Sequence, residues 1–241
     1  MNLAIFDIDG TLTDTNQVDA LCYVQALEVE FGLNDIADDW SQYTHSTDPG
    51  IMNQVFQTRL GRLPNKSDVA AFQKRFLALL AEQKQKDPGL FAEIKGAGAL
   101  LKALAANPDW IVAFATGGWA VTAKFKLEAA GLPADGLPFA CGDDAVSREN
   151  IMRLAMQRAR DAAGIKSFAK IVSLGDGVWD VKAARAMDLA FIGVGNQARL
   201  RKAGAGQMVA DFHDTATCLA LLELAPRLTS TSTLGRPTTQ T

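Results

Sequence analysis

Histidine and cysteine are scarce in this chain of 241 residues, and neither occurs in a pattern typical of a metal site or a disulfide framework. There are only 2 histidines, and the 3 cysteines (Cys22, Cys141 and Cys218) lie far apart, with no pair separated by two residues. The sequence therefore predicts neither a zinc site nor disulfide bonds. Free cysteines favour the reducing cytoplasm as the location.

The chain also lacks a large excess of positive or negative charge. The 24 basic and 27 acidic residues give a net charge of −3, and no long block of either sign occurs. Such a balance excludes the basic surface expected of proteins that bind nucleic acid or anionic membranes. No apolar stretch approaches the roughly 20 residues that span a bilayer. We therefore expect a small soluble ligand, no nucleic acid and no membrane, and a monomer or homodimer.

Short apolar runs and segments with helical periodicity alternate along the chain. The apolar runs cover residues 3–6, 110–115, 139–141, 171–174 and 190–194, and each is followed by Asp, Thr or Gly. Helical patterns lie between and after them, at residues 98–106, 120–130, 148–162, 181–187 and 216–224. This alternation predicts a doubly wound α/β fold around a sheet of parallel strands.

One long segment interrupts the alternation. Residues 16–89 show three helical patterns, at 18–31, 51–60 and 67–84, and no convincing strand. We predict that residues 16–89 form an inserted, all-helical cap domain, and that residues 1–15 and 90–228 form the α/β catalytic core. The last residues, 229–241, are rich in Thr and Ser, and we predict a disordered tail there because they cannot bury apolar area.

Four acids follow two of the predicted strands. Asp7 and Asp9 come directly after the first strand, with Gly10 next to them, and Asp176 and Asp180 come after the fourth. Ligands of open α/β sheets bind at the carboxyl ends of the strands. The spacing of four residues predicts that the second pair shares one face of an opening helix. Converging carboxylates without His or Cys favour Mg²⁺.

A third motif follows the predicted strand at residues 110–115. Thr116 is followed by Gly117 and Gly118 and then by a helical pattern. A hydroxyl and two backbone amides at a helix N-terminus form a suitable cradle for phosphate. Each of these motifs alone also occurs in ordinary turns and helix starts, but their joint occurrence at strand ends favours a functional site.

These motifs resemble those of the haloacid dehalogenase superfamily, in particular its phosphoglycolate phosphatase-like members with a helical cap. The resemblance implies that Asp7 is the nucleophile and that Asp9 is the general acid and base, as well as a metal ligand through its backbone carbonyl. It also implies that Thr116 binds phosphate and that Asp176 and Asp180 hold Mg²⁺ together with the first acid pair.

The resemblance extends over residues 1–224 and departs from the family at one point. The family usually has a lysine at the start of the helix before the fourth strand, where this sequence has Arg148. A guanidinium can bind both phosphate and carboxylate, so we expect Arg148 to replace that lysine as a catalytic cation. Lys124 and Lys126 are competing candidates, whereas Lys170 precedes its strand and is expected at the opposite sheet edge.

The expected activity is the Mg²⁺-dependent removal of a phosphoryl group from a small metabolite, such as phosphoglycolate or a sugar phosphate, through an aspartyl-phosphate on Asp7. Asp9 is expected to protonate the leaving alcohol and then to activate water. A phosphomutase and a catalytically silent phosphate-binding module remain alternatives. A phosphonate hydrolase is less favoured, because no lysine of the inserted segment has an evident desolvated setting for a Schiff base.

The inserted segment offers one candidate substrate contact, His45, in a polar loop before a helical pattern. The alternative is that Thr47 or Asp48 caps that helix and that His45 is simply exposed.

Overall fold

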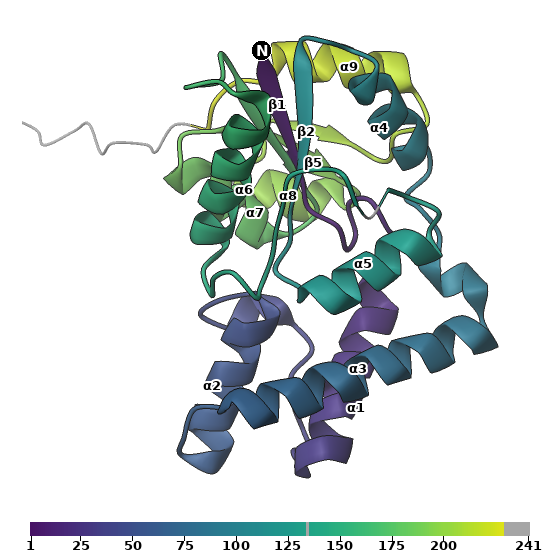
Figure 1. The fold of residues 1–241 in the computed structure, drawn as a ribbon, viewed down its shortest axis with the longest axis vertical. Coiled ribbons are helices and arrows are strands. Elements are labelled where there is room, and N and C mark those ends of the chain that lie inside the picture. Colours follow the sequence, from purple (N-terminus) through teal and green to yellow (C-terminus); the bar gives the residue numbers. More distant parts are fainter. Residues whose placement is uncertain (134, 229–241) are drawn as a thin grey trace, which may run out of the picture.

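The structure, a computed structural model, describes residues 1–133 and 135–228, so the predicted tail at 229–241 lies outside the described residues. Its centre is a sheet of parallel strands in the order β3-β2-β1-β4-β5-β6 (Figure 1). The strands are Asn2–Phe6 (β1), Trp110–Ala115 (β2), Phe139–Ala140 (β3), Ile171–Gly175 (β4), Ala190–Val194 (β5) and Gln207–Val209 (β6). The predicted doubly wound parallel sheet is confirmed.

Helices cover both faces of this sheet. One layer contains α4 (Ala97–Ala105), α5 (Ala120–Ala129) and α9 (Thr215–Leu224), and the other contains α6 (Arg148–Ala163), α7 (Val178–Ala186) and α8 (Gln197–Ala203). Strand β1 contributes Ala4 and Phe6 to the first apolar layer and Leu3 and Ile5 to the second. This alternation follows from the two-residue period of a strand, and burial on both faces explains why the strands are continuous apolar runs.

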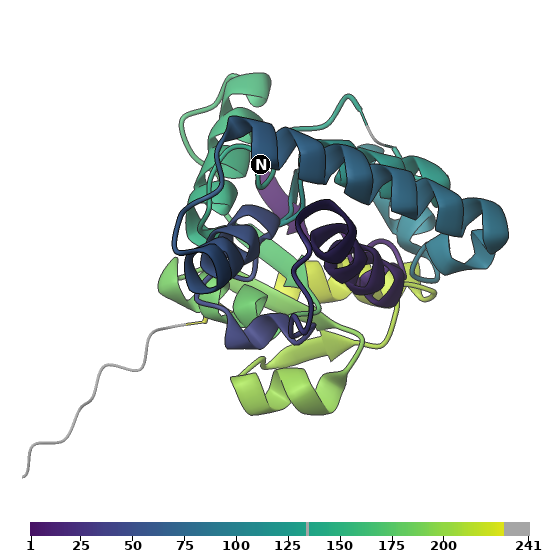
Figure 2. The same ribbon diagram turned by 90° about the horizontal axis from the view of Figure 1, so that it is seen from below.

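The segment between β1 and α4 forms a helical unit at one end of the molecule (Figures 1 and 2). It contains α1 (Asn16–Phe31), α2 (Asp48–Leu60) and α3 (Lys66–Lys86), with short 3₁₀ turns at Trp40–Gln42 (η1) and Pro88–Phe91 (η2). Tyr23 of α1 packs on Phe72 of α3, with ring centroids 4.8 Å apart, and Trp119 of the α/β core lies 5.2 Å from Phe72. This apolar cluster joins the helical unit to the core beside the start of α5. That the unit is a separate cap domain stays a prediction.

Side-chain caps fix the starts of two helices near the sheet. The hydroxyl of Thr47 accepts a hydrogen bond from the Gly50 amide at 3.2 Å and caps α2. The hydroxyl of Ser147 accepts one from the Asn150 amide at 3.3 Å and caps α6. These caps satisfy amides that a helix leaves unpaired, and they place Asp48 and Arg148 at the first position of their helices.

The sequence did not predict α8 or β6. Strand β6 has 3 residues, all only partly buried, and α8 has 7 residues, of which only Leu200 is buried. Both are too short to establish a hydrophobic period. Among the described residues, no helix combines the length and the apolar character needed to cross a membrane.

Candidate active site

The carboxyl ends of three adjacent strands bring the sequence motifs together. Strand β1 pairs with β2 on one side and with β4 on the other, so Asp7, Thr116 and Asp176 follow neighbouring strands at one edge of the sheet. The chain order along the sheet changes direction between β1 and β4, and such switch points are where open α/β sheets bind ligands. The amide of Asp7 donates to the Leu174 carbonyl at 3.0 Å, which fixes the turn after β1.

Three carboxylates form a cluster at this edge. Asp7, Asp176 and Asp180 each offer an oxygen, and these oxygens lie within 4.8 Å of one another. Oδ1 of Asp176 is buried and has no hydrogen-bond partner among the described residues. Burial raises the pKa of Asp176 to about 7, and the charge of Asp7 acts in the same direction. An unpartnered oxygen in a cluster of three carboxylates fits a hard divalent cation such as Mg²⁺.

The positions of Asp176 and Asp180 relative to helix α7 differ from the prediction made from the sequence. Helix α7 begins at Val178, so Asp176 lies in the loop before it and only Asp180 is helical. The expectation that both acids share one helical face was wrong. Asp180 instead accepts a hydrogen bond from the Gly177 amide at 3.0 Å, near the start of α7.

Gly10 allows the turn after β1 to approach the acid cluster closely. Its φ of 73° lies in the left-handed region, and a Cβ atom there would lie 2.1 Å from Nδ2 of Asn16 and 2.3 Å from Oδ2 of Asp176. Both distances are clashes. The same amide of Asn16 donates to that carboxylate oxygen at 2.7 Å, so the position needs glycine for its backbone and for space.

Arg148 is a cation in contact with the cluster. Its Nη1 lies 2.8 Å from Oδ1 of Asp7 and 3.4 Å from Oδ1 of Asp180. Burial alone would lower the pKa of Arg148, but the charges of Asp180 and Asp7 outweigh it and raise the pKa above its usual value. The buried Nε has no hydrogen-bond partner among the described residues, so a donor remains for an anionic ligand.

The other three cations considered from the sequence lie elsewhere. Lys124 is only partly buried and pairs with Asp135, with Nζ and Oδ1 2.6 Å apart. Lys170 donates to the backbone carbonyl of Glu223, at the end of α9. Lys126 is buried, but it pairs with Asp9 and Asp19 and not with the partners of Arg148.

The loop after β2 presents Thr116 to a pocket of about 50 Å³ that it shares with Asp7, Asp9 and Arg148. The hydroxyl of Thr116 accepts a hydrogen bond from the Gly118 amide at 3.1 Å, so that amide already has a partner. The Gly117 amide has none among the described residues.

The N-terminus of α5 is closed by carboxylates. The amide of Trp119 donates to Oδ2 of Asp48 at 3.0 Å, and the amide of Ala120 donates to Oδ2 of Asp143 at 2.7 Å. These two amides were not part of the predicted phosphate cradle, which consists of Thr116, Gly117 and Gly118 and stays a prediction. Within that cradle, the Gly117 amide is without a partner among the described residues, whereas the Gly118 amide donates to Thr116.

His45 lies outside the pocket of Asp7. It is exposed and lines a neighbouring pocket of about 90 Å³, which shares Arg148 and Trp179 with the first. Thr47 caps α2, which corresponds to the alternative in which His45 is exposed beside a capped helix. His45 and Arg148 line the same pocket, and a contact between His45 and the substrate stays a prediction.

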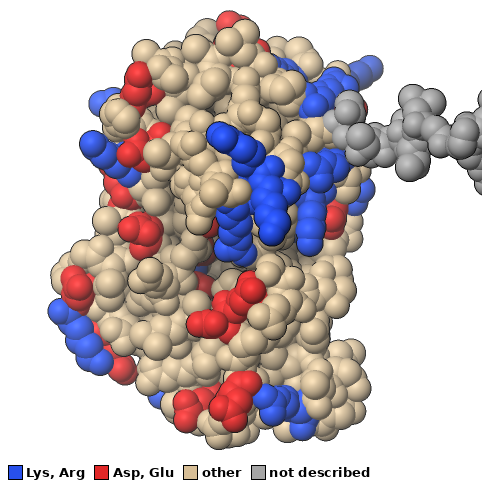
Figure 3. Space-filling view, turned by 180° about the vertical axis from the view of Figure 1, so that it is seen from behind, with Lys and Arg blue, Asp and Glu red and all other residues tan. Residues whose placement is uncertain are grey.

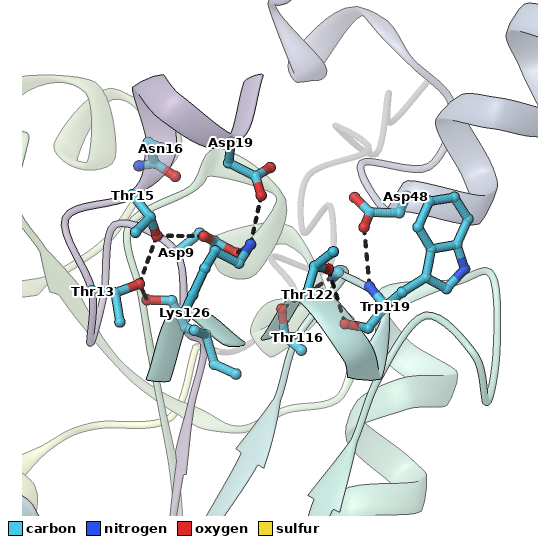
Figure 4. Close-up of polar contacts among 12 residues, drawn as sticks. Asp9, Thr13, Thr15, Asn16, Asp19, Asp48, Thr116, Trp119, Thr122 and Lys126 are labelled. Atoms are coloured by element: carbon cyan, nitrogen blue, oxygen red, sulfur yellow. Dashed lines mark hydrogen bonds and ion pairs between the residues drawn. The ribbon is translucent and has the colours of Figure 1, made fainter. Parts of the chain in front are cut away.

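The sequence missed a network around Asp9. Oδ2 of Asp9 pairs with Nζ of Lys126 at 2.6 Å, and the same ammonium lies 2.6 Å from Oδ1 of Asp19 in α1 (Figure 4). Oδ1 of Asp9 accepts a hydrogen bond from the Thr15 hydroxyl at 2.5 Å. Lys126 was considered from the sequence only as a substitute for Arg148, and Asp19 carried no signal beyond its place in the first turn of a helix.

A polar cavity of about 330 Å³ adjoins the acid cluster at the junction of core and helical unit. It is lined by Asp39, Trp40, Asp176, Trp179 and Arg199, among others. The guanidinium of Arg199 lies 3.9 Å from the carboxylate of Asp39 across the junction. Figure 3 shows basic side chains gathered on the core, in the upper half of that view, and acidic ones below them on the helical unit.

Comparison with known proteins agrees with this architecture. Residues 1–188 match the family of haloacid dehalogenase-like hydrolases. The chain belongs to this family. The resemblance seen in the sequence is thereby confirmed, and the chain is a hydrolase by its family. No curated protein matches the chain.

Several solved structures share the fold at low sequence identity. A hydrolase from Pseudomonas syringae has 22% identity and a TM-score of 0.70, with 93% of this chain and 100% of that one covered. A predicted phosphoglycolate phosphatase from Haemophilus somnus has 16% identity and a TM-score of 0.62, covering 90% and 97%. CbbY from Rhodobacter sphaeroides, in complex with phosphate, has 22% identity and a TM-score of 0.65, covering 88% and 95%.

Proposed function

We propose that this protein is a Mg²⁺-dependent phosphatase that acts on a small phosphorylated metabolite through an aspartyl-phosphate on Asp7. The observation that carries the proposal is the cluster of Asp7, Asp176 and Asp180, whose oxygens lie within 4.8 Å of one another beside Arg148. A carboxylate attacks phosphorus only where the negative charge of the phosphate is neutralised. Membership of a hydrolase family supports the same conclusion.

The proposed metal ligands are the carboxylates of Asp7, Asp176 and Asp180 and the backbone carbonyl of Asp9. When bound, Mg²⁺ would supply positive charge that stabilises the transferring phosphoryl group and holds its oxygens. Oδ1 of Asp176, which is buried without a partner among the described residues, supports this assignment.

The chain's own groups account for the remaining chemistry. A carboxylate oxygen of Asp7 attacks phosphorus and the ester bond breaks, while Asp9 donates a proton to the departing alcohol oxygen. A water molecule then gives a proton to Asp9 and attacks phosphorus, which releases inorganic phosphate and restores Asp7. Arg148, Thr116 and the Gly117 amide are proposed to bind the phosphate oxygens throughout.

The pocket supports a small substrate. Its volume is about 50 Å³, and Asp19 and Asp48 of the helical unit line it together with residues of the core. We propose that the helical unit acts as a cap that excludes bulk water from the reaction. The three buried, free cysteines support a reducing compartment such as the cytoplasm.

A panel of phosphorylated metabolites that includes phosphoglycolate and sugar phosphates, assayed with and without Mg²⁺, tests the proposal. We expect inorganic phosphate to be released from at least one substrate, with dependence on Mg²⁺ and loss on addition of a chelator. An isomerised sugar phosphate without release of phosphate would indicate a phosphomutase. Binding of phosphate without any turnover would indicate a silent binding module and would contradict the proposal.

A further inference from the structure

Lys126 is a buried cation that the proposed chemistry does not yet use. Its side chain is 1% exposed, and its Nζ lies 2.6 Å from a carboxylate oxygen of Asp9 and 2.6 Å from one of Asp19 (Figure 4). These acids come from different parts of the structure, because Asp9 follows β1 in the core and Asp19 belongs to α1 in the helical unit. The lysine therefore connects the core to the helical unit at the pocket.

The second oxygen of Asp9 is also held. Oδ1 accepts a hydrogen bond from Thr15 at 2.5 Å, and the Thr15 hydroxyl lies 2.7 Å from that of Thr13. Each carboxylate oxygen of Asp9 thus has one protein partner, and two partners fix the plane of the group. A carboxylate oxygen can accept more than one hydrogen bond, so both oxygens keep capacity toward a ligand.

A contribution to the stability of the fold does not by itself explain why a lysine is buried at this position. Removing an ammonium and carboxylates from water costs free energy, and well-packed apolar side chains often stabilise a protein as well as a buried ion pair does. Burial alone would lower the pKa of Lys126, but the charges of Asp19, Asp9 and Asp48 outweigh it and raise the pKa above its usual value. The lysine therefore stays charged at the place where it contacts Asp9.

We propose that Lys126 is a positioning residue that holds the Asp9 carboxylate in the orientation for proton transfer, and that Asp19 anchors Lys126 from the helical unit. The inference rests on the proposed function, because it takes Asp9 as the general acid and base. Misplacement of a catalytic group by about 1 Å can cost a large factor in rate. Because the anchor belongs to α1, the orientation of Asp9 depends on the position of the helical unit.

The test compares Lys126→Met with Lys124→Met. Lys124 lies on the same helix, but its side chain is 43% exposed and its Nζ pairs with Oδ1 of Asp135 at 2.6 Å, away from the pocket. For each variant, kcat/KM is measured with p-nitrophenyl phosphate and with the alkyl phosphate that the wild type hydrolyses best. An alkoxide needs a proton to leave, whereas p-nitrophenolate needs much less help. Since kcat/KM covers only steps up to release of the alcohol, later hydrolysis of the aspartyl-phosphate does not affect the comparison.

We expect Lys126→Met to lose at least about tenfold more kcat/KM on the alkyl phosphate than on the aryl phosphate, since general acid catalysis is worth about 10² to 10⁴ in rate. Lys124→Met should match the wild type on both substrates. An equal loss on both substrates, or no loss, overturns the inference while the proposed function stands. A wild type that hydrolyses neither substrate overturns the proposed function itself.

Asp19→Asn is the second variant, and it tests the same proposal if Lys126→Met does not fold. It keeps the shape of the anchor and leaves the pair between Lys126 and Asp9 in place. We expect a smaller loss in the same direction, with the alkyl phosphate affected at least about threefold more than the aryl phosphate. An Asp19→Asn variant that folds and shows no difference between the two substrates would contradict the anchoring role.

Discussion

The metal-free acid cluster should destabilise the protein as the pH rises, and Mg²⁺ should reverse this effect. Burial raises the pKa of Asp176 from an ordinary 3.8 to about 7 in the folded chain, with the charge of Asp7 adding to the increase. A raised folded pKa means that the folded state binds the proton more tightly than the unfolded state. The contribution of this group is therefore fully present below pH 4, declines as the pH rises, and is lost above about pH 7.

The expected loss of unfolding free energy follows from the pKa shift of Asp176. Each pKa unit corresponds to about 1.36 kcal/mol, so the two units between pH 5 and pH 7 correspond to about 2.7 kcal/mol for a fully desolvated group. The Asp176 side chain is partly exposed, and solvent reduces this value. We expect the free energy of unfolding to fall by about 1–2 kcal/mol between pH 5 and pH 8 on account of Asp176.

Urea denaturation at pH 5 and pH 8, with and without Mg²⁺, measures this contribution. Asp176→Asn is the control, because the difference between wild type and variant cancels the titration of distant groups. The metal-free variant should gain stability relative to the wild type at pH 8, and it should lose most of its response to Mg²⁺. Mg²⁺ at 100 times its dissociation constant should stabilise the wild type by about 2.7 kcal/mol at pH 8 and by less at pH 5, where protons compete.

Two results would refute this reasoning. One is an absence of any effect of Mg²⁺ on unfolding at pH 8, which would remove the cation from the cluster. The other is a wild type and an Asp176→Asn variant with the same pH dependence, which would show that the carboxylate is not desolvated in the folded protein.

Three further predictions concern catalysis. Asp7→Asn should retain less than about a hundredth of the wild-type kcat, because an amide is not the required nucleophile; a higher residual rate in phosphate-release assays would contradict its role. Asp9→Asn should still bind Mg²⁺ in calorimetry but lose about 10² to 10⁴ in kcat on alkyl phosphates, and near-normal turnover would remove Asp9 from the mechanism. Arg148→Ala should lower kcat/KM by at least about tenfold, with partial recovery in Arg148→Lys, whereas a kinetically silent Arg148→Ala would show that another cation binds the phosphate.

The fold was predictable because each signal is local. A strand buried on both faces is a short apolar run, and the five runs found in the sequence correspond to β1 to β5. The acid cluster was predictable for a related reason. Asp7 and Asp176 each follow such a run, and the parallel arrangement brings the ends of neighbouring strands together.

No comparable pattern in the sequence predicted the network around Asp9. Lys126 lies more than 100 residues from Asp9 and Asp19 in the chain, and only the packing of α5 against the loop after β1 and against α1 brings the three together. Thr47 or Asp48 was expected to cap the helix that follows, because Thr and Asp are both common cap residues. In the structure Thr47 is the cap, and Asp48 accepts the amide of Trp119 from the core. Contacts between the two units are set by tertiary packing, which hydrophobic periodicity does not describe.

The different positions of two cations within their helices explain why they contact different acids. Arg148 is the first residue of α6, so its side chain lies at the carboxyl edge of the sheet and contacts Asp7. Lys126 is the seventh residue of α5, roughly 9 Å further along the helix axis from its start at 1.5 Å per residue, and it contacts Asp9 instead. Asp7 and Asp9 are separated by a single residue and are proposed to do different work, one as nucleophile and one as proton carrier. A separate cation for each allows the two carboxylates to be held independently, so substitution of one cation should disturb the acid that it contacts and leave the geometry of the other acid unchanged.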